Sequence, residues 1–373
     1  MEWIFWGSVA VIGYAYLGYA AWLWVRCHWR LRTVQSAPHW PSISIVMVVH
    51  NEAAVLERKL RNLLDLNYPA DRTEIAVVSD GSTDDTNRLL TEFANVSRVR
   101  VILNSQSRGK AAGLNDAMAT ATGEIVIFTD ARQKIEADAV GLLLENFADP
   151  QVGCVSGELM LGDPDSGEAA RGMGLYWKIE KKIRQMESAS GSVVGATGAL
   201  YAVRRSLLVE LPPETILDDV YIPMHVLRQG SRVIFDPRAR VWDIADQGME
   251  REFARKVRTL SGNYQLFQLS PWLLSSANPV RFGLVSHKLI RLLVPFALVA
   301  LLISSCFLPG PVYRIALALQ VAFYGLSAWA LIGPKRGPLA KVADVAFTLV
   351  LLNTAAVVAF ANFVTGRRVV WAR

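Results

Sequence analysis

The sequence of 373 residues contains only three cysteines, Cys27, Cys154 and Cys306, and they lie far apart. They form no CxxC pair and no even set, so neither a disulfide framework nor a cysteine-based zinc site organises this protein. No GxGxxG motif follows the first strand-like run, which argues against a dinucleotide-dependent dehydrogenase. Gly109-Lys110 lacks both the upstream glycine and the following Ser or Thr of a P-loop, so a P-loop ATPase is also disfavoured.

Charge is scarce as well, because charged residues make up 19% of the chain and hydrophobic residues 52%. This balance is too apolar for a wholly soluble protein and too charged for one buried in lipid throughout. The formal charge of +6 comes without interleaved aromatic and basic residues. It therefore does not point to nucleic acid as a partner, and it fits an anionic lipid surface better.

The first apolar segment predicts a membrane anchor. No charged residue occurs from Trp3 to Val25, which is long enough to cross about 30 Å of hydrocarbon. Arginines follow at once, so we expect residues 1–32 to be a retained anchor whose N-terminus lies outside and whose basic end is cytoplasmic. Three later apolar runs predict a C-terminal membrane region over residues 291–373, and they lie at 292–308, 312–333 and 342–365.

The number of membrane crossings depends on which basic residues near the C-terminus are placed on the cytoplasmic side. The turn with Lys335 and Arg336 should be cytoplasmic, but four spans would place the basic tail with Arg368 and Arg373 outside. A re-entrant piece within 292–333 would instead leave three crossings. We expect four spans.

Residues 41–248 change character and predict one α/β domain. Apolar runs of strand length alternate with helical patterns, and the runs are apolar on both faces, which predicts a mainly parallel, Rossmann-like sheet covered on both sides. The strand runs are 43–50, 74–80, 99–104 and 124–130, and the helical patterns that follow them are 52–65, 83–94, 109–121 and 136–148. Residues 249–290 are amphipathic and predict helices at the membrane surface.

Polar residues collect where these predicted strands end. Ligands of such sheets bind outside the carboxyl ends of the strands, so residues 50–52, Asp80, Lys110 and Asp130 are expected to share a site. One acid at a strand end is most often a helix cap, but four polar strand ends together indicate binding. In such a site Asp80 could take a ribose hydroxyl or a base amide, Lys110 a phosphate, and Asp130 a divalent cation between two phosphates.

The ordered set of motifs resembles the membrane-bound, inverting glycosyltransferases of family 2, the group that contains cellulose, hyaluronan and chitin-oligosaccharide synthases. The resemblance covers nearly the whole chain. The matching segments are VVHNE (48–52), VVSDGSTDDT (77–86), RGKAAGLNDA (108–117), TDAR (129–132) on the DxD element, GATGALYAVRR (195–205), LDDV (217–220) on the TED element and ARKVRT (254–259) on the (Q/R)xxRW element.

This resemblance implies a GT-A fold, hexosyltransferase activity, a nucleoside-diphosphate sugar as donor with UDP as the expected nucleotide, and Mg²⁺ or Mn²⁺ held by Asp130. The implied donor-binding residues are Asn51, Glu52, Asp80, Lys110, Asp130, Arg132, Arg255 and Arg258. Asp219, the second acid of LDDV, is the expected catalytic base, because its neighbour Asp218 should raise its pKa. Asp218, Gly198 and Trp242 are assigned to the acceptor side.

Two positions depart from the family pattern. Arg132 replaces the last acid of DxD, so the cation would rely on one carboxylate, the diphosphate and water, and the arginine could contact a phosphate or an acidic acceptor. Thr259 stands where the family has a tryptophan that stacks on the acceptor sugar in processive members. Long-chain synthesis therefore does not follow from the resemblance, unless Tyr264, Phe267 or Trp272 substitutes.

The predicted function is transfer of a sugar to a growing polysaccharide or glycan by an integral inner-membrane enzyme whose catalytic domain is cytoplasmic. Expected partners are the sugar nucleotide, a saccharide or lipid-linked acceptor and membrane lipids. Two alternatives stay open. One is a single addition onto a polyprenyl phosphate or glycolipid, and the other is a non-catalytic membrane receptor that binds sugar nucleotides.

Overall fold

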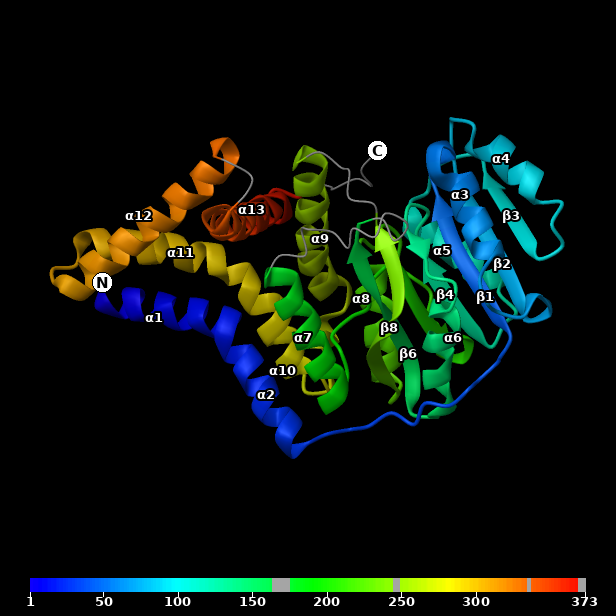
Figure 1. Cartoon of the computed structure of the whole chain (residues 1–373), viewed down its shortest axis with the longest axis horizontal. Coiled ribbons are helices and arrows are strands. Elements are labelled where there is room, and N and C mark those ends of the chain that lie inside the picture. Colours follow the sequence, from blue (N-terminus) through cyan, green and yellow to red (C-terminus); the bar gives the residue numbers. More distant parts are fainter. Residues whose placement is uncertain (163–174, 244–248, 334–336, 368–373) are drawn as a thin grey trace.

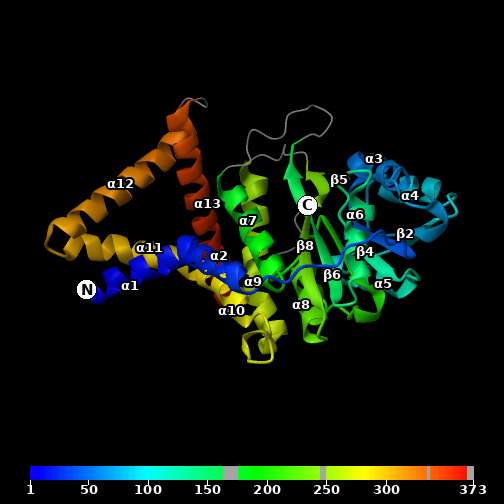
Figure 2. The ribbon, with the colours of Figure 1, turned by 60° about the horizontal axis from the view of Figure 1, so that its bottom comes forward.

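The computed structural model describes residues 1–162, 175–243, 249–333 and 337–367. It divides into a sheet domain and a group of long apolar helices, which lie at opposite ends of the molecule in Figures 1 and 2. Lys335, Arg336, Arg368 and Arg373, which bear on the expected membrane orientation, lie outside the described residues.

The sheet domain is the expected mainly parallel α/β sheet. Its strands are β1 (Ile43–Val49), β2 (Thr73–Asp80), β3 (Val99–Asn104), β4 (Ile125–Thr129), β5 (Lys134–Ile135), β6 (Val152–Leu161), β7 (Leu200–Arg204) and β8 (Arg232–Asp243). They are ordered β3-β2-β1-β4-β7-β6-β8-β5. β1 pairs in parallel with both β2 and β4, whereas β7 runs antiparallel to β4 and to β6. The chain order therefore reverses between β1 and β4, which is where sheets of this class bind ligands.

The fully apolar strands explain why both faces are covered. All seven residues of β1 are buried, and alternate residues point to opposite faces. Ile45 and Met47 pack on one side with α3 (Ala53–Leu64) and α6 (Ala139–Glu145), whereas Val46 and Val48 pack on the other with α5 (Lys110–Thr120) and α8 (Asp218–Arg228). α4 (Thr86–Phe93) completes the first layer. The predicted strand and helix order over residues 43–148 is confirmed.

Within the described residues, four helical segments are long and apolar enough to cross a membrane, as expected of a membrane protein. They are Glu2–Trp29, Arg281–Phe307, Pro311–Ile332 and Pro338–Val364. The first comprises α1 (Glu2–Gly13), a π-helical turn (Tyr14–Gly18) and α2 (Tyr19–Trp29), and Figure 1 shows a bend there, which is typical of a π-bulge. The second, built from α10 (Arg281–Leu284), a π turn (Val285–Leu289) and α11 (Ile290–Phe307), begins well before the predicted run at 292. α12 (Pro311–Ile332) and α13 (Pro338–Val364) are the other two.

Two helices connect the membrane helices with the sheet. α9 (Met249–Leu269) stands between α13 and the sheet in Figure 1, and the Tyr264 ring stacks on Phe363 of α13 with centroids 5.0 Å apart. α7 (Leu175–Ser190) lies between α2 and β8. The sheet is therefore bordered by helices that also touch the long apolar helices.

Candidate active site

The loop after β1 is held in shape by its own polar side chains. Asn51 adopts a left-handed backbone with φ 55°, and its side-chain oxygen accepts a hydrogen bond of 2.8 Å from the backbone N–H of Thr83. The backbone N–H of Glu52 donates to Thr86 Oγ1 at 3.0 Å. These bonds tie the ends of β1 and β2 together and leave the Glu52 side chain facing the next strand end, after β4.

Asp80 at the end of β2 organises the loop that leads to Lys110. Its carboxylate is fully buried and accepts backbone N–H bonds of 2.8 Å from both Arg108 and Gly109, as well as one of 2.7 Å from Ser107 Oγ. A side chain at Gly81 would place its Cβ 2.3 Å from the Ser107 nitrogen, so the close approach requires glycine. Asp80 thereby acts on the site through this loop, and its contact with a nucleoside stays a prediction.

Lys110 joins two carboxylates from distant parts of the chain. It begins α5, and its Nζ lies 3.0 Å from Asp130 Oδ1 and 3.1 Å from Asp218 Oδ1. Burial opposes its charge, but Asp130, Asp218 and Asp219 together raise the pKa of Lys110 above its usual value. The lysine is therefore a permanent cation at the centre of the site.

Arg132, the unexpected residue of TDAR, pairs with an acid of the neighbouring loop. Its Nε lies 3.1 Å from Glu52 Oε1, and both side chains remain partly exposed. The pair crosses from the end of β4 to the end of β1. The predicted contact of Arg132 with a phosphate or an acidic acceptor is untested by this arrangement, but the arginine does face the same cavity as Asp130.

Asp218 and Asp219 open α8 and point in different directions, as expected for adjacent helical residues. Asp218 is buried and pairs with Lys110, whereas Asp219 Oδ2 accepts the Gly198 N–H at 3.0 Å. A Cβ at Gly198 would lie 3.4 Å from Asp219 Oδ2 and 3.8 Å from Asp130 Oδ2. The glycine thus lies between the expected base and the expected metal ligand. Burial and the Asp218 charge raise the pKa of Asp219 to about 6.

The two arginines of α9 face the same region but differ in their partners. Arg255 lies 3.2 Å from Asp243 Oδ2 and also pairs with Glu252. Within the described parts of the chain, Arg258 has no carboxylate within 4.0 Å. Of these two arginines, Arg258 is therefore the more available to an anionic ligand.

Three neighbouring cavities meet around Lys110 and Arg258. The first, about 430 Å³, is lined by seven of the eight predicted donor-binding residues, Asp80 being the exception. The second, about 320 Å³, shares Lys110 and Asp130 with the first and adds Gly198, Asp218 and Asp219. The third, about 710 Å³, extends from the 107–111 loop to the end of α13. The structure therefore brings the predicted donor and catalytic residues together.

Comparison with known proteins agrees with this geometry. Residues 44–211 match the model of "Glycosyl transferase family 2". The chain carries a glycosyl transferase family 2 domain. Over 228 residues it is 24% identical to a poly-beta-1,6-N-acetyl-D-glucosamine synthase of Staphylococcus aureus strain COL, which covers 60% of this chain and 55% of the synthase. The Staphylococcus epidermidis synthase is also 24% identical, over 62% of this chain and 56% of its own length. The chain thus spans about half the length of these relatives.

The whole chain has the fold of a solved mannosyltransferase. The mannosyltransferase PcManGT from Pyrobaculum calidifontis, solved in complex with GDP-Man and Mn²⁺, superposes with a TM-score of 0.76 over 97% of this chain and 99% of its own. The two share 22% sequence identity. This likeness extends the fold beyond the glycosyl transferase family 2 domain and includes the long apolar helices.

Trp242, assigned to the acceptor side, is not brought to these cavities. It is buried at the edge of the sheet opposite Lys134, and its indole N–H donates to Glu136 Oε1 at 2.7 Å. It packs as part of β8 because the alternating pattern of that strand turns it away from the cavity. Asp243, the next residue, lines both of the first two cavities.

Two residues at or near the candidate site were not predicted from the sequence. Asp243 follows the same rule as the other acids, since it ends a strand, but β8 was not among the predicted strands. Lys59 of α3 is buried, and its Nζ donates to Thr129 Oγ1 at 2.8 Å and to the Gln133 carbonyl at 2.9 Å. Burial lowers the pKa of Lys59 to about 7. The sequence did contain a signal for this burial: Lys59 comes three residues after Leu56 and one before Leu60, on the buried side of α3.

A fourth cavity, about 330 Å³, continues from Asp219 towards the membrane helices. Thr197, Asp219, Lys256 and Thr259 line both it and the second cavity. Its far wall holds a cluster in which His287 lies 2.6 Å from Glu180 Oε1 and 2.9 Å from Glu187 Oε1. This cavity lies on the opposite side of Asp219 from Lys110 and Asp130, where the acceptor is expected.

Proposed function

We propose that this chain is an inverting glycosyltransferase that transfers a sugar from a nucleoside-diphosphate sugar to a hydroxyl group of a saccharide acceptor, with Asp219 as the general base. The observation that carries the proposal is the pair of carboxylates on either side of Gly198, with Lys110 bridging from Asp130 to Asp218. One cavity thus holds a carboxylate, Asp219, that can accept a proton and a cation, Lys110, that can contact a diphosphate.

The chemistry assigned to these residues is a single displacement. The acceptor oxygen forms a bond to the anomeric carbon while the bond from that carbon to the diphosphate oxygen breaks, and the nucleoside diphosphate leaves. The proton of the acceptor hydroxyl moves to Asp219. A base with a pKa of about 6 is ionised at neutral pH and still basic enough to assist the attack. Lys110 and Arg258 would compensate the charge that develops on the diphosphate.

The donor set around Asp130 fits a divalent cation with few protein ligands. Among the described residues, no group of three His, Cys, Asp or Glu side chains is placed to hold a metal ion. The side chain of Asp130 is 39% exposed, so it can offer one carboxylate while the diphosphate and water complete the shell. We propose Mg²⁺ or Mn²⁺ at this position, where the ion would neutralise part of the diphosphate charge.

The residues around Thr259 bear on the length of the product. At position 259 the side chain is threonine, whose Oγ1 donates to the Arg255 carbonyl at 3.0 Å, and it stands where the second and fourth cavities join. None of the three candidate aromatic substitutes lines either cavity: Tyr264 stacks on α13, Phe267 packs against the core and Trp272 packs near His225. This favours the alternative of one or few additions, onto a glycolipid or a polyprenyl phosphate, over long-chain synthesis.

We also propose that the sheet domain faces the cytoplasm, because Arg26, Arg30 and Arg32 follow the first membrane segment on that side. A cysteine introduced at the exposed Arg88 of α4 tests this. We expect Arg88→Cys to react with a membrane-impermeant maleimide only after intact cells are permeabilised. Labelling in intact cells would contradict the orientation.

The function itself is tested by nucleotide release from UDP-sugars and GDP-sugars by the detergent-solubilised full chain, with and without Mg²⁺ or Mn²⁺. We expect release with one donor class, dependent on a divalent ion, and none from Asp219→Asn. The size of the labelled product, measured by mass spectrometry, separates one addition from many. Binding of a donor without release under any condition, with any acceptor, would favour the receptor alternative.

A further inference from the structure

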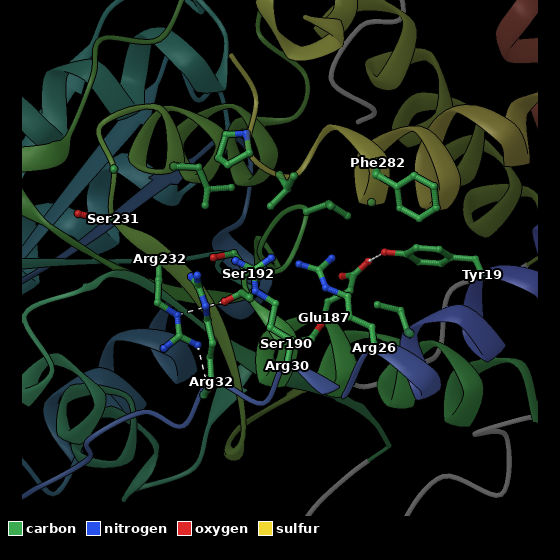
Figure 3. A pocket seen from close by; sticks show the side chains of 18 residues that line it. Tyr19, Arg26, Arg30, Arg32, Glu187, Ser190, Ser192, Ser231, Arg232 and Phe282 are labelled. Carbon is green, nitrogen blue, oxygen red and sulfur yellow. Dashed lines mark hydrogen bonds between the residues drawn. The ribbon is translucent and has the colours of Figure 1, made fainter. Parts of the chain in front are cut away.

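A fifth cavity lies where the first two membrane segments meet the sheet domain. It has a volume of about 270 Å³ and shares no lining residue with the three cavities around Lys110. Its walls come from the end of α2, the chain just after it, residues 190–192 after α7, residues 230–232 at the start of β8, and residues 279–283 at the start of α10. Figure 3 shows the side chains that surround it.

The cavity is lined by four arginines, Arg26, Arg30, Arg32 and Arg232. Arg232 is 6% exposed, and its guanidinium donates only to backbone carbonyls, among them those of Gly191 at 3.1 Å and Ser188 at 3.2 Å. Within the described parts of the chain, none of the four has a carboxylate within 4.0 Å. Four cations therefore line one space, and none of them forms a close ion pair within the described parts of the chain.

Among the described residues, Glu187 is the one acid that lines the cavity, and it is bonded to other partners. Glu187 is buried, and its Oε1 accepts the Tyr19 hydroxyl at 2.7 Å and lies 2.9 Å from His287 Nδ1. Figure 3 shows this carboxylate joined to Tyr19 at one end of the cavity, whereas Arg32 and Arg232 lie at the other. The arginine end therefore has the charge and donor groups to hold an anion.

Exposed aromatic residues around the cavity indicate that it lies at the membrane surface. Trp24 is 59% exposed, Trp29 is 86% exposed and Phe282 is 48% exposed. The rings of Trp22 and Phe282 lie 4.4 Å apart, so the end of the first segment contacts the start of the second. Exposed tryptophans at the end of an apolar helix are typical of the lipid headgroup level. The cavity thus opens between two membrane helices at that level.

We propose that this cavity binds the phosphate group of an anionic phospholipid headgroup. Planar guanidinium groups bind phosphate through paired N–H bonds, and basic pockets between membrane helices are suited to acidic headgroups. A volume of about 270 Å³ is smaller than the roughly 300–1,000 Å³ typical of sites that enclose a whole small ligand. It suits a headgroup whose acyl chains lie outside, along the exposed ring of Phe282.

The bound headgroup would join three parts of the chain. Arg26 and Arg30 belong to the anchor, and Arg232 belongs to the sheet, where it already donates to the carbonyls of Arg32 and Thr33 at 3.2 and 3.3 Å. A phosphate between these groups would fix the sheet domain to the membrane anchor. This inference does not depend on the proposed function, since none of its residues is assigned to catalysis.

Lipid binding by the delipidated full chain in non-ionic detergent tests the proposal. Native mass spectrometry would compare phosphatidylglycerol with phosphatidylcholine for the wild-type chain, Arg30→Gln and the double variant Arg26→Gln/Arg30→Gln. Arg281→Gln is the matched control, because Arg281 is exposed at the same helix start but does not line the cavity. We expect the affinity for phosphatidylglycerol to fall about fivefold for each arginine removed from the cavity, and less than about twofold in the control.

Two results with the phospholipids would overturn the proposal. One is an equal loss of phosphatidylglycerol in Arg281→Gln and Arg30→Gln, which would mean general attraction to a basic surface. The other is equal retention of phosphatidylcholine and phosphatidylglycerol by the wild-type chain. Glycerol 3-phosphate distinguishes the source of the phosphate: weaker binding than phosphatidylglycerol supports the lipid, and equal binding would contradict a lipid ligand in favour of a soluble phosphate. Thermal unfolding of each variant in detergent checks that it is folded.

Discussion

The proposed donor side and the proposed acceptor side of the site are built differently. On the donor side, Arg132 and Asp130 are partly exposed to a cavity and Arg258 has no acid within 4.0 Å among the described residues. On the acceptor side, Glu180 and Glu187 are tied to His287, and Glu180 also pairs with Arg291 at 2.8 Å. The donor side thus keeps Arg258 available for a ligand that brings its own negative charge, while Lys110 and Arg132 are paired with Asp130 and Glu52 at the cavity wall. The acceptor side uses its charges on one another, which fixes α7 against the second membrane segment.

The largest expected effect is the loss of stability when the cluster of Glu180, Glu187 and His287 is disrupted. Glu180→Gln leaves Arg291 without its acid and His287 with Glu187 alone, and breaking a fully buried ion pair costs about 3–5 kcal/mol, which is an upper bound for this partly buried one. We expect a clearly lower midpoint of thermal unfolding in detergent. Glu57→Gln, which removes the exposed pair with Arg61, should change the midpoint little, because such pairs contribute about 0–1 kcal/mol. Equal midpoints for the two variants would show that the cluster does not hold the domains together.

A second test addresses the donor side. Asp130→Ala removes the one carboxylate assigned to the cation, so donor binding measured calorimetrically should weaken about 100-fold when Mn²⁺ is present and little when it is absent. Asp65→Ala, an exposed acid at the end of α3, is the matched control. A loss of the same size without metal would mean that Asp130 acts only through its pair with Lys110.

The difference between the two α9 arginines sharpens the comparison further. Arg258→Gln should weaken donor binding about tenfold, because a charge-assisted bond to a phosphate is lost. Arg255→Gln should weaken it less than about threefold, since Arg255 is already occupied by Asp243 and Glu252. The measurement is the donor Kd of each variant. A greater loss in Arg255→Gln would reverse their assigned roles.

The smallest expected effect is the dependence of the rate on pH. A base must be deprotonated to act, and burial raises the pKa of Asp219 to about 6, so activity should be nearly full at pH 7.5 and fall as the pH drops through 6. At pH 5.5 kcat/KM should be about fourfold lower than at pH 7.5. A profile that is flat from pH 7.5 to 5.5 would contradict this environment for the base.

The parallel half of the sheet could be predicted because its strands are apolar on both faces. β1, β2, β3 and β4 lie where the runs at 43–50, 74–80, 99–104 and 124–130 were expected, and the polar residues after them do meet. The antiparallel β7 could not be placed in the sheet from sequence, because its position between β4 and β6 depends on contacts between distant segments. Trp242 shows the same limit, since the register of β8 decides which face a side chain joins.

Site residues at the ends of strands could be predicted from the sequence, whereas side chains that reach the site from distant segments could not. Lys110, Asp130 and Asp219 were named from motifs, and they lie together. Lys59 and His287 were missed because both are buried against polar partners from distant segments. A sequence pattern alone predicts a lysine at the surface and a histidine without a charged partner. The arginines around the fifth cavity come from residues about 200 apart, so only the fold reveals that they face one space.

Asp219→Asn tests the central claim most directly, with sugar transfer and donor binding measured on the same detergent-solubilised preparation. We expect kcat to fall by about 10²- to 10⁴-fold because the general base is lost, while the donor Kd changes less than about twofold. Asp65→Asn should leave both unchanged. If Asp219→Asn transferred sugar at the wild-type rate, or lost donor binding together with transfer, Asp219 would not be the base.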